Sequence, residues 1–388
     1  MRLHHLLHMT LSIAVVDCMM GCVTPDHAKV VVVPQRSVHA QTSARREQQQ
    51  TLHHVSTFKM PITATLAVNA DIYYPAKPAW PKTLVIIVPG SGNISRLGEV
   101  AQGLHASEEW AKALSNQGFF VLSYDKRTCQ HGQNPQCESN GQKDIDQQGI
   151  KVLAEDLDQA YQAAIHKLNL SHEQVRVVLL SSTQGAQAIS LSQCGKLVNG
   201  IALFSPIIGN LEAMWVKTLD RARQQKSTSG EKNHLINRKE SMVDFFESLK
   251  EGKFPENATF RGASIKFWMS WIEASKHTLG RLEALNKPTL LLFSSNDDVS
   301  DKNALRGQDT KYIQVKYYSD CDRNFVTANG VPKRPLNEIL MFINKLGASI
   351  PTFSMSPRGE VRGVHRSATA WTPRTTPRGD KFLTPRGD

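Results

Sequence analysis

The sequence predicts an α/β fold with a mostly parallel central sheet and helices on both of its faces. Apolar, strand-like segments recur at residues 83–88, 177–180 and 287–293. Such continuous apolar runs are typical of strands that are covered on both faces of a parallel sheet. Between them lie segments with helical spacing of apolar residues, at 108–117 and 155–167. The alternation of the two patterns indicates parallel strands joined by helical crossovers.

The length and composition predict one large domain with extended ends. A chain of 388 residues that is 40% hydrophobic can bury a large core. We assign residues 56–348 to the core domain and residues 23–55, which lack hydrophobic periodicity, to a linker. Residues 349–388 repeat a Pro-Arg-Gly theme with few apolar anchors, so we expect a disordered tail there.

The formal net charge of +11 does not by itself indicate a nucleic-acid partner. Much of the basic excess lies in the C-terminal tail and the middle of the chain, not on one amphipathic face with interleaved aromatic residues. We therefore interpret it as solvated surface and expect no binding of nucleic acid.

The N-terminus resembles a bacterial lipoprotein signal. A short basic start is followed by a mostly apolar stretch that ends in Met19-Met-Gly-Cys22. Asp17 inside the apolar stretch and Met19 both depart from the usual pattern. From residues 1–22 we expect export, to the periplasm, a membrane-anchored position or the cell surface, with Cys22 carrying the lipid. A wrongly assigned start or a poorly packed N-terminal segment is the alternative.

A strand that turns sharply into a helix lies at the centre of the chain. The strand at 177–180 runs into Ser181-Ser-Thr-Gln-Gly185 and then into a helical pattern. Small residues two before and two after a central hydroxyl are the layout of a nucleophile elbow, with Thr183 at the centre. The usual serine and the usual first glycine are both missing. A polar strand-to-helix turn without catalytic function is the alternative.

A glycine-containing loop follows the strand at 83–88. It begins Pro89-Gly-Ser-Gly92, and its glycines let backbone N–H groups turn outward at the carboxyl end of the strand. Ligands bind at this edge in open α/β sheets. A plain tight turn is the alternative.

In this order, the motifs resemble the α/β-hydrolase family, nearest its esterase-like members. The resemblance consists of the PGSG loop with a following Ser-Arg96, the Tyr124-Asp-Lys-Arg127 turn after the next strand, and the elbow, and it covers residues 58–208 and 286–345. It implies oxyanion-hole N–H groups at Gly90 or Ser91 and at Gln184. It also implies a lid at 208–285, where the sequence is mostly helical, with predicted helices at 241–250 and 264–277.

The resemblance also places the other two members of a catalytic triad. Asp297, in Ser294-Ser-Asn-Asp297, matches the position of the acid. Where the family commonly has the general-base histidine, this chain has Arg323. A guanidinium stays protonated and cannot act as a base. We expect Asp297 and Arg323 to form a charge-assisted pair and leave a positive charge suited to an anionic ligand.

From these residues we predict an exported α/β-hydrolase-fold protein with weak or lost serine-hydrolase activity. The expected ligand is a small acyl or anionic molecule, with no cofactor. Two alternatives stay open. One is an active hydrolase of acyl esters that takes its base from the lid, at His234 or His277. The other is a non-catalytic surface protein that binds a ligand or partner.

The cysteines predict one disulfide. Cys129 and Cys137 lie in a polar loop, and their spacing together with an export signal favours a bridge. Free thiols, or half of a metal site, are the alternatives. The chain has no CxxC pair or HxxxH run, so we expect no metal. Cys194 is interpreted as a buried apolar residue.

Overall fold

The computed structural model describes residues 53–347, except for 102–103, 130–144, 147, 172, 227, 256, 295–304, 306–308 and 320. The predicted signal segment, nearly all of the linker, and the Pro-Arg-Gly tail lie outside the described residues. The same is true of Cys22, Cys137 and Asp297.

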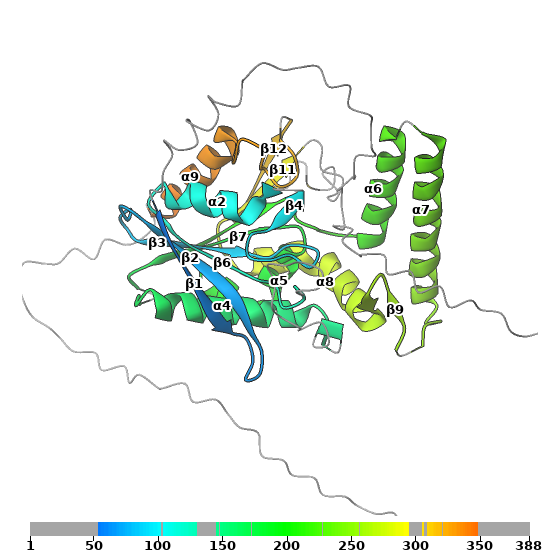
Figure 1. Cartoon of the computed structure of the whole chain (residues 1–388), viewed down its shortest axis with the longest axis horizontal. Helices are drawn as coiled ribbons and strands as arrows, with labels where there is room; N and C mark the ends of the chain where they lie inside the picture. Colours follow the sequence, from blue (N-terminus) through cyan, green and yellow to red (C-terminus); the bar gives the residue numbers. More distant parts are fainter. Residues whose placement is uncertain are drawn as a thin grey trace, which may run out of the picture. The chain divides into compact units, whose positions relative to one another are not determined.

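An eight-stranded sheet forms the centre of the domain (Figure 1). The first two strands add to it in antiparallel fashion, and the remaining strands run parallel. In spatial order the strands are β1 (His53–Pro61), β2 (Ala67–Pro75), β6 (Phe120–Tyr124), β3 (Thr83–Val88), β7 (Arg176–Ser182), β8 (Gly200–Phe204), β11 (Thr289–Ser294) and β12 (Ile313–Tyr318). The predicted mostly parallel sheet is confirmed.

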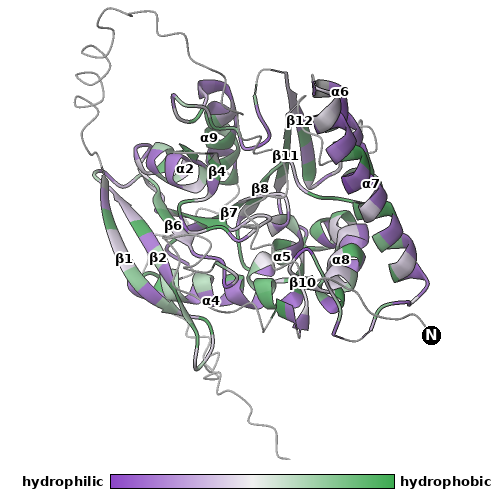
Figure 2. Cartoon of the chain, turned by 45° about the vertical axis from the view of Figure 1, so that its right-hand side comes forward, coloured by the Kyte–Doolittle hydropathy of each residue, from purple (hydrophilic) through white to green (hydrophobic). Residues whose placement is uncertain are grey.

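Helices cover both faces of the sheet, as the sequence predicts. On one face lie α2 (Ala106–Ser115) and α9 (Lys333–Gly347), and on the other α4 (Lys151–Lys167), α5 (Gly185–Leu191) and α8 (Ile265–Ala284) (Figure 1). Every residue of β3 and of β8 is buried. Figure 2 shows β7 and β8 as mostly hydrophobic. Burial on both faces explains why these strands read as continuous apolar runs.

The segment between β8 and β11 is helical, as expected. It comprises α6 (Leu211–Gln225), α7 (Ser229–Lys250), the short strands β9 (Thr259–Phe260) and β10 (Ala263–Ser264), and α8. The tryptophans of α8, Trp268 and Trp271, are buried and pack against each other with ring centroids 5.4 Å apart. Their role is therefore packing. That this insertion acts as a lid stays a prediction.

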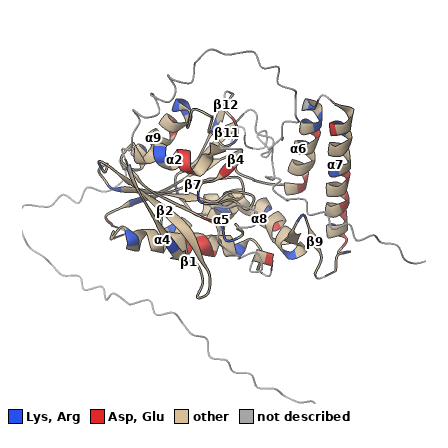
Figure 3. Cartoon of the chain, viewed as in Figure 1, with Lys and Arg blue, Asp and Glu red and all other residues tan. Residues whose placement is uncertain are grey.

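Smaller features were not predicted. Two short strands, β4 (Glu99–Ala101) and β5 (Leu104–His105), follow the PGSG loop, and a 3-10 turn, η1 (Cys194–Lys196), holds Cys194. Cys194 is 2% exposed and not bridged, in agreement with its predicted role. Of the helices that the structure describes, none is long and apolar enough to cross a membrane. Basic and acidic residues are interspersed along these helices (Figure 3).

Candidate functional site

Thr183 occupies a strained turn between β7 and α5. Its φ is +47°, a region that is unfavourable for a β-branched residue and costs about 1–3 kcal/mol. Backbone hydrogen bonds hold it there: its N–H donates to Phe204 O at 3.2 Å, and its carbonyl accepts from Ile207 N at 3.2 Å. A Cβ added at Gly185 would collide with the side chain of Ser181. The predicted elbow geometry and the need for small flanking residues are therefore both present.

The PGSG loop lies directly against this turn. The Ser91 N–H donates to Thr183 Oγ1 at 2.9 Å. A Cβ added at Gly90 would lie 2.7 Å from Ser182 Oγ and 2.8 Å from Thr183 Oγ1, closer than real Cβ contacts allow. Glycine is thus required at position 90 by this close approach. Of the two predicted donors in the loop, Ser91 is the one whose N–H faces the hydroxyl.

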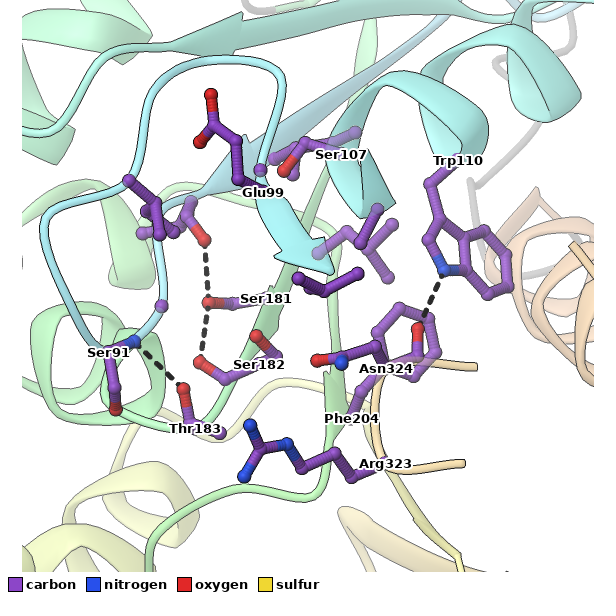
Figure 4. Close-up of a pocket in the computed structure, with 18 residues that line it drawn as sticks. Ser91, Glu99, Ser107, Trp110, Ser181, Ser182, Thr183, Phe204, Arg323 and Asn324 are labelled. Carbon is purple, nitrogen blue, oxygen red and sulfur yellow. Dashed lines mark hydrogen bonds between the residues drawn. The ribbon is translucent and has the colours of Figure 1, made fainter. Parts of the chain in front are cut away.

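A pocket of about 70 Å³ opens at the carboxyl ends of these strands. It is lined by Ile87, Val88, Gly90, Ser91, Ile94, Gly98, Glu99, Val100, Ala106, Ser107, Trp110, Leu180, Ser181, Ser182, Thr183, Phe204, Arg323 and Asn324. Figure 4 shows the Arg323 guanidinium directed toward Thr183, and the Glu99 carboxylate pointing away from it. Glu99 accepts from the N–H and the hydroxyl of Ser95.

The segment that carries Arg323 is held by contacts on both sides. Trp110 Nε1 donates to Asn324 O at 3.3 Å, and its ring stacks on Phe204 with centroids 4.6 Å apart. Phe325 is fully buried, has a φ of +54°, and packs against Phe204 at 5.2 Å. These contacts hold the backbone around Arg323, which lines the same pocket as Thr183; that Arg323 occupies the position of the base stays a prediction.

Several predicted site residues are not placed in this pocket. Asp297 lies outside the described residues, so its pairing with Arg323 stays a prediction. His234 is exposed on α7, and His277 is exposed on α8, where its Nε2 lies 2.9 Å from Glu273 Oε1. Neither histidine lines the pocket. Within the described parts of the chain, no group of three or more His, Cys, Asp or Glu residues could hold a metal ion.

The predicted disulfide is not tested. Cys129 is fully buried, and Cys137 lies outside the described residues. The bridge stays a prediction.

Sequence reasoning missed an ionic network that locks the two loop motifs together. Asp125 accepts from the Arg96 backbone N–H at 2.7 Å and from its guanidinium at 3.3 Å, and Arg96 Nε donates to Asp71 at 2.9 Å. Arg127 Nε donates to Asp156 on α4 at 2.8 Å in a fully buried pair. The sequence signal that could have indicated this network is the charged run Asp125-Lys-Arg127, which directly follows the buried strand β6. Charges at such a place need partners.

Lys126, between these two, is buried and faces the site from behind. Its Nζ donates to Gly90 O and Gly92 O, both at 2.9 Å, and to Gln184 Oε1 at 2.6 Å. Burial lowers the pKa of Lys126 to about 7, while the nearby Asp156 carboxylate acts to raise it. The backbone N–H of Gln184, the second predicted oxyanion donor, has no acceptor within the described part of the chain.

A hydroxyl residue held at positive φ between a central strand and a helix, with a backbone N–H from the neighbouring loop donating to it, is typical of the α/β-hydrolase fold. Comparison with protein families identifies the family within this fold. The model described as "Serine aminopeptidase, S33" matches residues 81–320, more than half of the chain. The chain belongs to this family.

Several solved structures are similar to this chain at low sequence identity. Proline iminopeptidase from Mycobacterium smegmatis is 11% identical with a TM-score of 0.51, and the match covers 76% of this chain and 99% of that one. Est1E from Butyrivibrio proteoclasticus is 11% identical, with a TM-score of 0.47 and coverage of 75% and 99%. A carboxyl esterase from Bacillus coagulans is 14% identical, with a TM-score of 0.47 and coverage of 76% and 99%. No curated protein matches the sequence.

Proposed function

We propose that this chain is an α/β-hydrolase-fold protein in which conventional ester hydrolysis is weak or lost and the pocket binds a small anionic ligand. The observation that supports the proposal is that Thr183 and Arg323 line one pocket, with the guanidinium directed toward Thr183. We assign Thr183 to the nucleophile position and Arg323 to the position of the general base. The guanidinium cannot take a proton from the hydroxyl at any physiological pH. A nucleophile without a base is weak.

The contact between Ser91 and Thr183 supports the same proposal. In acyl transfer, oxyanion-hole N–H groups must face the oxygen on which charge develops. Here the Thr183 hydroxyl itself accepts the Ser91 N–H. An incoming carbonyl oxygen would have to replace that contact, next to a side chain with an additional methyl group.

The charge and shape of the pocket support an anionic ligand. Arg323 presents a guanidinium, which binds carboxylates through two parallel hydrogen bonds. The walls are mainly apolar, and Glu99, the carboxylate among the described lining residues, is bonded to Ser95. Ligand pockets commonly measure about 300–1,000 Å³, so a volume of about 70 Å³ favours a short carboxylate or a short terminal group.

Ester turnover tests the loss of hydrolysis. Wild type and Thr183→Ala are assayed on p-nitrophenyl acetate and butyrate, and both are treated with a fluorophosphonate serine probe. We expect equal, low turnover and no label on Thr183. Turnover in wild type that Thr183→Ala abolishes would show a working hydrolase with its base elsewhere, and His277→Ala and His234→Ala would then locate that base.

Calorimetry tests the anionic ligand. Acetate, butyrate and hexanoate are titrated into wild type and Arg323→Met, with the matching alcohols as uncharged controls. Charge-assisted hydrogen bonds contribute about 1.5–3 kcal/mol, so Arg323→Met should bind carboxylates about 10- to 100-fold more weakly. Binding of the carboxylates that Arg323→Met leaves unchanged would contradict this part of the proposal.

We also propose export, lipid attachment at Cys22 and a bridge between Cys129 and Cys137. The sequence motifs support all three. Metabolic labelling with a palmitate analogue should mark wild type but not Cys22→Ala in membrane fractions. Thiol alkylation without reductant should leave Cys129 and Cys137 unmodified. Labelling of both thiols would exclude the bridge.

A further inference from the structure

Lys126 makes three hydrogen bonds that converge on the site from the side opposite the pocket. Its ammonium group has three N–H donors, and the structure supplies three acceptors, namely the carbonyls of Gly90 and Gly92 and the side-chain oxygen of Gln184. A fully buried lysine requires such partners, because an unpaired buried charge is strongly unfavourable. These three acceptors are enough to engage all three N–H donors.

The first of these contacts determines where the Ser91 N–H points. Gly90 C=O and Ser91 N–H belong to one peptide unit, which is planar and trans, so they point in opposite directions. With the carbonyl held on Lys126 at 2.9 Å, the N–H must face the other way. It reaches Thr183 Oγ1 at 2.9 Å. Rotation of this peptide would break both hydrogen bonds together.

The third contact ties the other predicted donor to the same ammonium. Gln184 follows Thr183, and its backbone N–H is the second oxyanion donor that the family resemblance implies. Its side chain is 2% exposed and accepts from Lys126 Nζ at 2.6 Å. One cation thus connects Gly90 and Gly92 of the PGSG loop to Gln184, the residue after Thr183.

We infer that Lys126 is a positioning residue that orients the Ser91 and Gln184 N–H groups by holding Gly90, Gly92 and Gln184 from behind. It does not touch a ligand in the pocket, since it is absent from the pocket lining. The inference uses the proposed oxyanion role of these N–H groups, but not whether hydrolysis survives. It predicts that the orientation of the Ser91 and Gln184 N–H groups depends on Lys126, a residue outside the triad.

The protonation of Lys126 should control this arrangement. Loss of one proton leaves two donors for three acceptors, so at least one hydrogen bond must be released. Burial lowers the pKa of Lys126 to about 7. Among the described residues, Asp156 on α4, which is bound by Arg127, and Tyr124 at the end of β6 line the same small cavity as Lys126. Asp156 favours the protonated amine, while burial opposes it.

The experiment follows the Ser91 and Gln184 amides by 1H–15N NMR and hydrogen exchange, which needs neither turnover nor a ligand. Wild type is compared with Lys126→Met and Lys126→Arg. The control is Arg176→Met, since Arg176 is also a buried cation that donates to a carbonyl, Ile343 O at 2.8 Å, at the opposite end of β7. Lys126→Met should raise Ser91 amide exchange about tenfold or more beyond the Arg176→Met control, and Lys126→Arg should restore part of the protection.

A second measurement uses wild type alone, so that a variant that fails to fold does not decide the result. The Ser91 amide shift should follow the titration of Lys126 Nζ, observed directly in 15N-lysine-labelled protein. If Lys126→Met leaves the Ser91 amide as protected as in the control, or if the amide is insensitive to Lys126 titration, the inference is wrong. If the amide responds but carboxylates do not bind, the inference stands and the anionic ligand is the part that fails.

Discussion

Restoring both altered triad positions should produce ester hydrolysis. The change is Thr183→Ser together with Arg323→His. Thr183→Ser removes a methyl group from a residue that is 7% exposed and has a φ of +47°, and keeps the hydroxyl beside the Ser91 N–H. Arg323→His supplies an imidazole on a segment that already lines the pocket and is held by Trp110.

The size of the effect follows from how triad members act together. Losing either the nucleophile or its base costs nearly as much as losing the whole triad, so one repair alone should add little. General base catalysis contributes about 10²- to 10⁴-fold. We expect the double variant to exceed each single variant at least ~100-fold in kcat/KM, equivalent to about 2.7 kcal/mol of transition-state stabilisation.

The assay is hydrolysis of short activated esters by wild type, the two single variants and the double variant, each purified in parallel. A further Thr183→Ala change in the Arg323→His background controls for contaminating esterases. If wild type is as active as the double variant, Thr183 and Arg323 are not the residues that limit turnover. If the double variant is inert while its fold and Ser91 amide are unchanged, the assigned position of the base or the acid is wrong.

Three further changes test the surroundings of the site. Gly90→Ala should cost about 1–3 kcal/mol in the free energy of unfolding, because the new Cβ would lie 2.7 Å from Ser182 Oγ, and urea unfolding measures this. Trp110→Phe should lower the free energy of unfolding by about 1 kcal/mol, because it removes the hydrogen bond from Trp110 Nε1 to Asn324 O. It should also weaken carboxylate binding at Arg323, which calorimetry measures. A Trp215→Phe variant, away from the pocket, serves as the control. Because the pKa of Lys126 is about 7 in the folded state and about 10.4 in the unfolded chain, the unfolded state binds more protons between these values. The free energy of unfolding of wild type should therefore rise with pH across that window relative to Lys126→Met, and equal slopes would show that Lys126 does not titrate there.

Most of the fold could be predicted from the sequence because burial on both faces leaves a strong local signal. The strand expected at 83–88 coincides with β3, and the helix expected at 155–167 lies within α4. The predicted helix boundaries were wrong where the apolar pattern was weak. The helix α7 begins at Ser229, twelve residues before the predicted start, and Thr228 caps its N-terminus. Its first three turns are largely exposed, so the apolar pattern there was weak.

The site was only partly predictable, for a different reason. Thr183 was located by its place in a strand-to-helix turn, and the resemblance to the α/β-hydrolase family implied the roles of Ser91 and Arg323; all three follow strands, and parallel strands bring such residues to one edge of the sheet. Lys126 was passed over because its importance depends on partners that lie 34 to 58 positions away in the sequence, at Gly92 and Gln184. A lysine in a polar turn normally indicates solvent exposure. Only tertiary structure shows that it is buried.

The residues that shape this pocket and those that would carry out acyl transfer are therefore separate sets. The first set includes Lys126, Arg96 and Arg127, each of which has charged or carbonyl partners that hold the loops in place. Leaving such buried charges unpaired costs about 3–5 kcal/mol each, so the fold itself requires them whether or not the site reacts. The proposed binding of an anion depends on the Ser91 N–H and the Arg323 guanidinium, neither of which needs a general base.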